Sequence, residues 1–423
     1  MLISFAVENH RSIRDRVELS FVAERKPTVA GRAGLPVPGF DMELVPALAL
    51  LGANGSGKSN LLDAIEYVQQ AVERSQARWP ADGPPPREAF QGASATPSRY
   101  ELSFTAFDVV YDYRFAVGPD AIVWEALDYA PRGPKSWAKL FERQTDPSGR
   151  VMIDAGRQLK GPRAAAVAAT RPNSLFLSSA AQNNHEILGG VHRVIVRGLK
   201  AGAPHDRARR GQYTQARYLG GDAEYQRRLS AFVASADLGI EGVEVREEQT
   251  DLDPAYLKLV PPGPNGEWPP RARVRTRFRH RGVGELDLSQ QSAGTRAWFE
   301  WAALVLDSLD GGLVLGADEL DAHLNVVLAS QIVTLFQSAE TNTRGAQLLF
   351  NLQDPGVITD AGLGRDQVWV VEKDEDGATT VVPVTDYSPR PELDVGRLYR
   401  HGRVGGLPVV DEPLLHAVVG REG

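Results

Sequence analysis

The first third of the chain alternates hydrophobic and polar positions in a way that predicts strands. Residues 2–7 and 17–22 alternate well enough to form two strands, joined by the polar turn 8–15. Residues 77–99 are rich in Pro, Gly and Ala, which predicts a surface loop. Alternating aromatic and β-branched residues then fill 100–130. We therefore expect an N-terminal hairpin, a loop and a meander of strands.

The pattern changes further along the chain. From about residue 164 to 236 the spacing of apolar residues becomes helical. Later, the apolar segments "GLVLGADEL" and "AQLLFNLQD" are separated by the helical segment "AHLNVVLASQIVTLFQSA". Strands that alternate with helices predict a mostly parallel sheet in the last third of the chain.

Three glycines and a lysine follow an apolar run in "LALLGANGSGKSNLLDAI", residues 48–65. Gly52, four residues, and then Gly57-Lys58-Ser59 fit the phosphate-binding loop called Walker A, because N–H groups close around phosphates only where no side chain intrudes. Lys58 is expected to reach the β and γ oxygens, and Ser59 to ligate Mg²⁺. The expected nucleotide-binding residues of this loop are Gly52, Asn54, Gly55, Ser56, Gly57, Lys58, Ser59 and Asn60.

The composition narrows the class of protein. The chain has 42% hydrophobic and 24% charged residues, as folded globular proteins do, and no cysteine, so a metal must be held by oxygen or nitrogen ligands. Its start lacks the pattern of a signal peptide, and its apolar runs are too short for a bilayer, so we expect a cytoplasmic protein with no membrane partner. The net charge of -7 disfavours a generally basic nucleic-acid binder but leaves a local patch open.

A second motif supplies carboxylates. The apolar run in "GGLVLGADELD" ends in Asp318, placed to hold Mg²⁺ through water, and Glu319, placed to orient and deprotonate an attacking water. A buried strand that happens to end in acids is the alternative. Ser292 and Gly294 precede an amphipathic helix, where free N–H groups favour an anion or simply form a helix cap.

Together these segments resemble SMC-like and ABC-class ATPases, and most closely the bacterial ATPases of the abortive-infection and OLD type. The resemblance rests on "LISFAVENHRSIRDRVELS", "LLGANGSGKSNLLDAI", "SQQSAGTRAW", "LVLGADELDAHLN" and the ending from "VWVVEKDEDGATTVV" to "GRVGGLPVV". It implies an α/β P-loop NTPase with an ABC-type head, in which a mixed sheet is joined by an N-terminal antiparallel β subdomain. We expect ATPase lobes at 1–150 and 270–423, and a mainly helical lid or arm at 160–265.

In that family one ATP lies between two heads. The resemblance therefore implies a homodimer or higher oligomer that binds and hydrolyses ATP with Mg²⁺, with Ser292 and Gly294 reaching the γ-phosphate in trans. Asp321 matches an aspartate that crosses the dimer interface, and Asn9 and Arg11 match a turn near the nucleotide, or form an ordinary surface turn. The family further implies a sensor or regulator of anti-phage defence with a separate nuclease or toxin as effector.

One position departs from the family, whose next strand usually ends in Thr-His-Asp. Here Gln353 replaces the histidine. Glutamine can donate a hydrogen bond but carries no charge, so we expect catalysis by Glu319, Lys58 and Gln353 to be slow or partner-dependent. His323 either substitutes for the missing histidine or makes a structural bond. The rival functions are a DNA-repair or chromosome-maintenance ATPase of the RecF or SMC type, and a non-hydrolysing scaffold that holds ATP.

Two charged segments have competing interpretations. Glu372, Asp374 and Asp376 suggest either a β-hairpin turning at Asp376-Gly377, which we favour, or the acidic cluster of a Toprim nuclease. In "RARVRTRFRHR" arginine recurs with period two, so a strand would place the arginines on one face, where they must meet anions. Internal carboxylates, an acidic partner and nucleic-acid phosphates all qualify. The arginines are Arg271, Arg273, Arg275, Arg277, Arg279 and Arg281.

Overall fold

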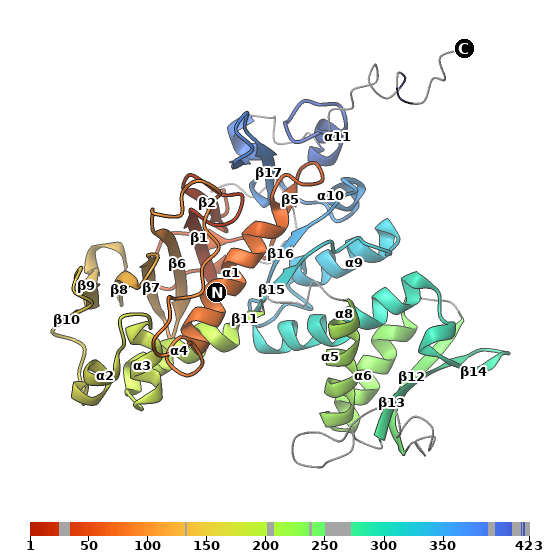
Figure 1. The fold of residues 1–423 in the computed structure, drawn as a ribbon. Coiled ribbons are helices and arrows are strands. Elements are labelled where there is room, and N and C mark those ends of the chain that lie inside the picture. The colour runs from red at the N-terminus through yellow and green to blue at the C-terminus, as the bar shows by residue number, and fades with distance from the viewer. Residues whose placement is uncertain are drawn as a thin grey trace. The chain divides into compact units, whose positions relative to one another are not determined.

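The computed structural model describes residues 1–24, 34–131, 133–200, 207–236, 239–249, 272–387 and 394–407, together with His416 and Val418. The chain divides into two compact units, which Figure 1 traces in the colour order of the sequence. Unit 1 contains Met1–Ala203, Ser308–Asp321 and Ala329–Gly423, and unit 2 contains Pro204–Asp307 and Ala322–Leu328.

Unit 1 contains an antiparallel sheet in the order β10-β9-β8-β7-β6-β1-β2. Its strands are β1 (Leu2–Glu8), β2 (Val17–Ser20), β6 (Ser98–Ala106), β7 (Val109–Val117), β8 (Ile122–Ala130), β9 (Ala138–Thr145) and β10 (Val151–Ala155). In β1, Phe5 pairs with Leu19 of β2 and Leu102 of β6, and all three side chains are buried. The expected N-terminal hairpin and the meander are confirmed.

The second sheet of unit 1 has the order β11-β15-β16-β5-β17-β18. Its strands are β5 (Ala47–Leu51), β11 (Leu199–Lys200), β15 (Val314–Ala317), β16 (Gln347–Asn351), β17 (Val368–Lys373) and β18 (Thr379–Pro383). All neighbours pair in parallel except β17 and β18. Both faces are covered, so β5, β15 and β16 are buried throughout, as apolar runs require. The carboxyl ends of β15, β16 and β5 lie side by side at one edge (Figure 1).

Unit 1 also contains helices and two short strands outside these sheets. The remaining elements are β3 (Leu35–Pro36), β4 (Glu43–Leu44), α1 (Lys58–Arg74), η1 (Pro134–Ser136), α2 (Ala164–Ala169), α3 (Phe176–Gln182), α4 (Glu186–Gly198), α10 (Gly356–Asp360), η3 (Arg365–Gln367), η4 (Val384–Tyr387) and α11 (Val395–Arg400), with most of α9 (Val326–Gln337). Helix α1 packs on α3 and α4. Buried Glu125 accepts hydrogen bonds from the backbone N–H groups of Phe176 and Leu177 and so caps α3. Helices α2 to α4, which the sequence predicts as part of the 160–265 arm, thus belong to unit 1.

Unit 2 has its own core. Its elements are α5 (Arg207–Gly220), α6 (Ala223–Ala234), β12 (Ile240–Gln249), β13 (Ala272–His280), β14 (Gly284–Asp287), η2 (Leu288–Gln290) and the part of α8 (Ala293–Gly311) that precedes Ser308. Strands β12, β13 and β14 form an antiparallel sheet, and Phe278, Leu229 and Phe299 share its hydrophobic core. Residues 272–307, predicted as the start of the C-terminal lobe, lie in this unit. Among the described residues, helices long and apolar enough to cross a membrane are absent.

Candidate phosphate-binding and carboxylate site

Strand β5, a glycine-rich loop and helix α1 lie in the order that the sequence predicts. Gly57 is the N-cap of α1 with φ 107°, a conformation that side chains disfavour. A Cβ at Gly57 would lie 2.1 Å from Thr379 Oγ1, so only glycine fits. The Ser56 hydroxyl is buried without a hydrogen-bond partner in the described structure. A loop of left-handed glycines with an unsatisfied buried hydroxyl before a helix N-terminus fits a bound phosphate.

The Lys58 side chain forms hydrogen bonds back to the backbone of the loop. Its ammonium donates to the carbonyl oxygens of Gly52 at 2.6 Å and Ala53 at 2.9 Å. Burial lowers the pKa of Lys58 below its ordinary value, while the nearby carboxylates of Asp318 and Glu319 act in the opposite direction. The lysine therefore lies close to the two acids at the end of β15, and its charge is available for phosphate oxygens.

The hydroxyl of Ser59 donates to Asp318 Oδ1 at 2.9 Å. This contact joins the start of α1 to the end of β15, residues that are 259 positions apart in the sequence. A hydroxyl and a carboxylate are oxygen ligands of the kind that Mg²⁺ prefers beside nucleotide phosphates. Clusters of three or more His, Cys, Asp or Glu side chains that could hold a metal alone are absent from the described part of the chain. The site thus fits a Mg²⁺ that is shared with phosphates.

Glu319 has a left-handed backbone, with φ 51°. Gln353 Nε2 lies 3.4 Å from Glu319 Oε1, in position to donate a hydrogen bond. Asp321 Oδ2 accepts the backbone N–H groups of Gln353 at 2.9 Å and Asp354 at 2.7 Å. The following candidate site residues therefore all lie in unit 1: Lys58, Ser59, Asp318, Glu319, Asp321 and Gln353.

Two residues that contact this site were not identified from the sequence. Asn351, at the end of β16, donates through Nδ2 to Asp318 Oδ1 and accepts the Glu319 N–H. Thr379, at the start of β18, donates to the Ser56 carbonyl at 2.8 Å and contacts Ser12 Oγ at 2.7 Å. Both lie in segments that the sequence analysis quotes, but neither was assigned a role there. Only the position of Asn351 at the end of an apolar strand, next to the strand of Asp318, could have singled it out.

The N-terminal turn carries Asn9 and Arg11, both with positive φ. The Asn9 side chain donates to the carbonyls of Ala93 and Thr96. The Arg11 guanidinium pairs with Asp63 of α1 and with Glu88. Both side chains thus have partners within unit 1, and Asn9 is buried.

Ser292 and Gly294 lie in unit 2, at the start of α8. Ser292 is exposed, and its hydroxyl accepts the Thr295 N–H at 3.1 Å, so it caps the helix. A Cβ at Gly294 would lie 3.3 Å from the carbonyl oxygen of His323. His323 has φ 65°, is exposed and belongs to unit 2, whereas Gln353 belongs to unit 1.

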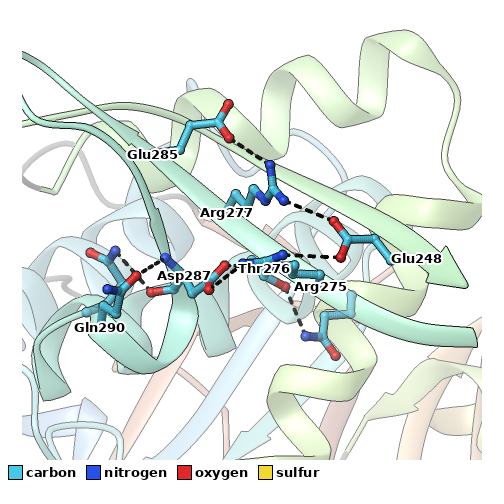
Figure 2. A network of polar contacts seen from close by, with 9 residues as sticks. Glu248, Arg275, Thr276, Arg277, Glu285, Asp287 and Gln290 are labelled. Carbon is cyan, nitrogen blue, oxygen red and sulfur yellow. Dashed lines mark hydrogen bonds and ion pairs between the residues drawn. The ribbon is translucent and has the colours of Figure 1, made fainter. Parts of the chain in front are cut away.

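The arginine-rich segment forms strand β13. Arg275 pairs with Glu248 and Asp287, and Arg277 pairs with Glu248 and Glu285 (Figure 2). These carboxylates come from the neighbouring strands β12 and β14, so internal acids supply anions on both sides.

The remaining arginines are placed less regularly. Arg279 and Arg281 lie 3.6 Å from Glu241. Arg281 is in the turn after β13 rather than in the strand. The strand therefore does not hold all six of the arginines that the sequence predicts on one face. Arg271 lies outside the described residues, as does the side chain of Arg273.

The acidic segment 372–376 belongs to an antiparallel hairpin of β17 and β18. Asp374 Oδ1 accepts the backbone N–H groups of Asp376 and Ala378, and Gly377 has φ 77°. Glu372 accepts the N–H of Gly406. The expected hairpin is confirmed: Glu372 and Asp374 accept backbone N–H groups, and the Asp376 carboxylate pairs with the Arg14 guanidinium.

The family model described as "AAA domain, putative AbiEii toxin, Type IV TA system" matches residues 48–358. Comparison with curated proteins gives no match. Among solved structures, an SMC head bound to the C-winged helix domain of ScpA is similar at 15% identity and a TM-score of 0.45, over 90% of this chain and 97% of that one. The SMC head domain from Thermotoga maritima is similar at 15% identity and a TM-score of 0.40, over 90% of this chain and 98% of the other. Because the family model spans most of the sequence, from β5 to α10, the chain belongs to this AAA-domain family of P-loop ATPases.

Proposed function

We propose that the protein binds ATP with Mg²⁺ and hydrolyses it. The observation that carries the proposal is the 2.9 Å contact between Ser59 Oγ and Asp318 Oδ1, which unites the phosphate loop with the carboxylate strand. Oxygen ligands for a metal, a lysine for phosphate and a carboxylate for water occur together in P-loop ATPases. Family membership supports the same activity.

Each residue has a distinct role in this proposal. The loop N–H groups and Lys58 bind phosphate oxygens. Ser59 and Asp318 would hold a Mg²⁺, which would supply positive charge beside the phosphates. Glu319 orients the attacking water and accepts its proton. Gln353 donates to Glu319 and keeps its carboxylate facing the water, and because an amide carries no charge we expect slow turnover.

In this proposal, ATP binding and hydrolysis control whether two subunits associate. Ser292 is exposed at the N-terminus of α8, where the helix dipole favours an anion. In this proposal Ser292 and Gly294 of one subunit complete the site of a second, so ATP joins two heads and hydrolysis parts them. The family description names a putative toxin and a type IV toxin–antitoxin system, which supports a role in a system of more than one component. We extend this to regulation of a separate effector in anti-phage defence. Copurification of a nuclease or toxin from the native host would support this role, and copurification of DNA alone would favour the chromosome-maintenance rival.

The activity is tested by phosphate release and by binding of a fluorescent ATP analogue. Lys58→Ala should abolish binding, whereas Glu319→Gln should retain binding and lose turnover at least about 100-fold, because only the general base is removed. Mixing Lys58→Ala with Ser292→Arg should restore turnover if the site is shared between subunits. Undiminished turnover by Glu319→Gln would refute the assignment of the base.

A further inference from the structure

Asn351 is the last residue of β16, the strand that lies between the phosphate-loop strand β5 and the carboxylate strand β15. Its side chain is buried, with 1% of the residue exposed. A buried amide must satisfy its donor and its acceptor, or the fold loses about 1–3 kcal/mol for each unsatisfied group. The partners of Asn351 therefore reveal what the amide is for.

Both ends of this amide contact the candidate catalytic acids. Nδ2 donates to Asp318 Oδ1, and Oδ1 accepts the backbone N–H of Glu319. An ionised carboxylate only accepts and a backbone N–H only donates, so the side chain fits in one orientation. Asn351 also uses its backbone carbonyl, which accepts the N–H of Leu320 at 3.1 Å.

The turn held in this way is strained. Glu319 adopts φ 51°, a left-handed conformation that costs a non-glycine residue about 1–2 kcal/mol. The contacts from Asn351 to the Glu319 and Leu320 N–H groups offset that cost. Meanwhile the same amide shares Asp318 Oδ1 with the hydroxyl of Ser59. A single side chain thus restrains the carboxylate proposed for the metal and the backbone of the proposed base.

We infer that Asn351 is a positioning residue for hydrolysis, which fixes the Asp318 carboxylate toward Ser59 and holds Glu319 in the turn that presents its side chain. This inference rests on the proposed ATPase function. It adds a role for a residue that acts through its hydrogen bonds to Asp318 and Glu319. Residues that orient metal ligands and bases in this manner typically change activity about 10–100-fold when replaced.

Strand β16 offers a matched control at its other end. Gln347 is also a buried amide, and it accepts the Leu2 N–H at 2.6 Å and donates to the Leu2 carbonyl at 2.8 Å. Asn351→Leu and Gln347→Leu therefore each remove two hydrogen bonds from the same strand. Only Asn351→Leu removes them from the acids.

The experiment compares these variants in the full chain. Asn351→Leu should lower kcat about 10–100-fold while ATP affinity in EDTA changes less than about twofold, because the phosphate loop is untouched. Hydrogen exchange of a peptide covering 318–321, measured without nucleotide, should rise in Asn351→Leu and stay unchanged in Gln347→Leu. In a Glu319→Gln background, Asn351→Leu should lower the single-turnover rate by a smaller factor than in the wild type, because the part of its effect that acts through Glu319 is already lost. Asn351→Ser, which keeps one hydroxyl for two partners, should lie between Asn351→Leu and the wild type.

Several results would overturn the inference. Equal losses of kcat in Asn351→Leu and Gln347→Leu would assign Asn351 a purely structural role, as would fully additive losses with Glu319→Gln. Unchanged exchange at 318–321 would show that the amide does not restrain the turn. If the wild type itself releases no phosphate, the proposed ATPase function fails, and the exchange measurement still decides whether Asn351 holds Asp318 and Glu319.

Discussion

Asp307 forms side-chain hydrogen bonds that connect three helices of unit 2. Its carboxylate, in α8, accepts from Arg217 Nε at 2.6 Å and Nη2 at 2.8 Å, both on α5. The hydroxyl of Tyr213, also on α5, donates at 2.5 Å, and that of Tyr225 on α6 donates at 2.9 Å. Burial alone would raise the pKa of Asp307, but the hydrogen bonds from Arg217, Tyr213 and Tyr225 lower it overall.

Asp307→Asn preserves the shape of the side chain and removes its charge. One of the two carboxylate oxygens becomes an NH₂ group, which cannot accept from Arg217. The remaining arginine bond loses its anionic acceptor, so each of the two arginine bonds accounts for a loss of about 1 kcal/mol. The side chain of Arg217 is 40% exposed, so solvent screens part of the pair, whereas Asp307 is 12% exposed. The change should lower the free energy of unfolding by about 2 kcal/mol, a factor of about 30 in the folding equilibrium.

The control is Glu224→Gln, because Glu224 pairs with Arg227 on α6 and both side chains are more than half exposed. It should change stability by less than about 0.5 kcal/mol. Urea unfolding gives the two free energies, and hydrogen exchange of α5 and α6 localises the change. If Asp307→Asn costs no more than Glu224→Gln, the carboxylate does not join these helices, and the reasoning from hydrogen-bond geometry fails.

Two further predictions concern pH and nucleic acid. Burial, reinforced by the Arg11 charge, lowers the pKa of His10 to about 4, so the unfolded chain binds more protons; stability should fall by about 2 kcal/mol between pH 7 and 5. His10→Phe should abolish this component of a urea titration, and an unchanged pH slope would contradict the burial argument. Because Arg275 and Arg277 are paired with internal acids, replacing Arg275 with Gln should leave the slope of log affinity for duplex DNA against log salt unchanged. A slope of about -3 to -4 that flattens in Arg275→Gln would restore the phosphate interpretation.

The phosphate loop and the acid strand could be predicted from the sequence because each depends on local spacing. Gly57, Lys58 and Ser59 are consecutive, so a motif fixes their geometry without knowledge of the rest of the fold. Asp318 and Glu319 end an apolar run, which places them at the carboxyl edge of any parallel sheet. The hairpin turn at Gly377 follows from the same kind of local signal.

Long-range partners could not be predicted in this way. Strand β13 is predictable from its period of two, but the acids opposite Arg275 and Arg277 depend on the register of β12 and β14, which the sequence does not specify. The division into two units is equally non-local, because α2 to α4 and α5 to α6 have similar helical patterns and differ only in the core that each joins.

The contacts that connect Asp321, Gln353 and Glu319 are a second example of long-range partners that the sequence does not predict. The sequence establishes that Gln353 is uncharged, and hence that it cannot act as a histidine does. It does not establish that the Asp321 carboxylate accepts the backbone N–H groups of Gln353 and Asp354. That contact fixes the backbone at Gln353, whose side-chain Nε2 lies 3.4 Å from Glu319 Oε1. A glutamine in place of the family's histidine therefore does more than remove a charge. The proposed base, Glu319, lies beside a donor whose strength is constant across pH and whose backbone is held by Asp321.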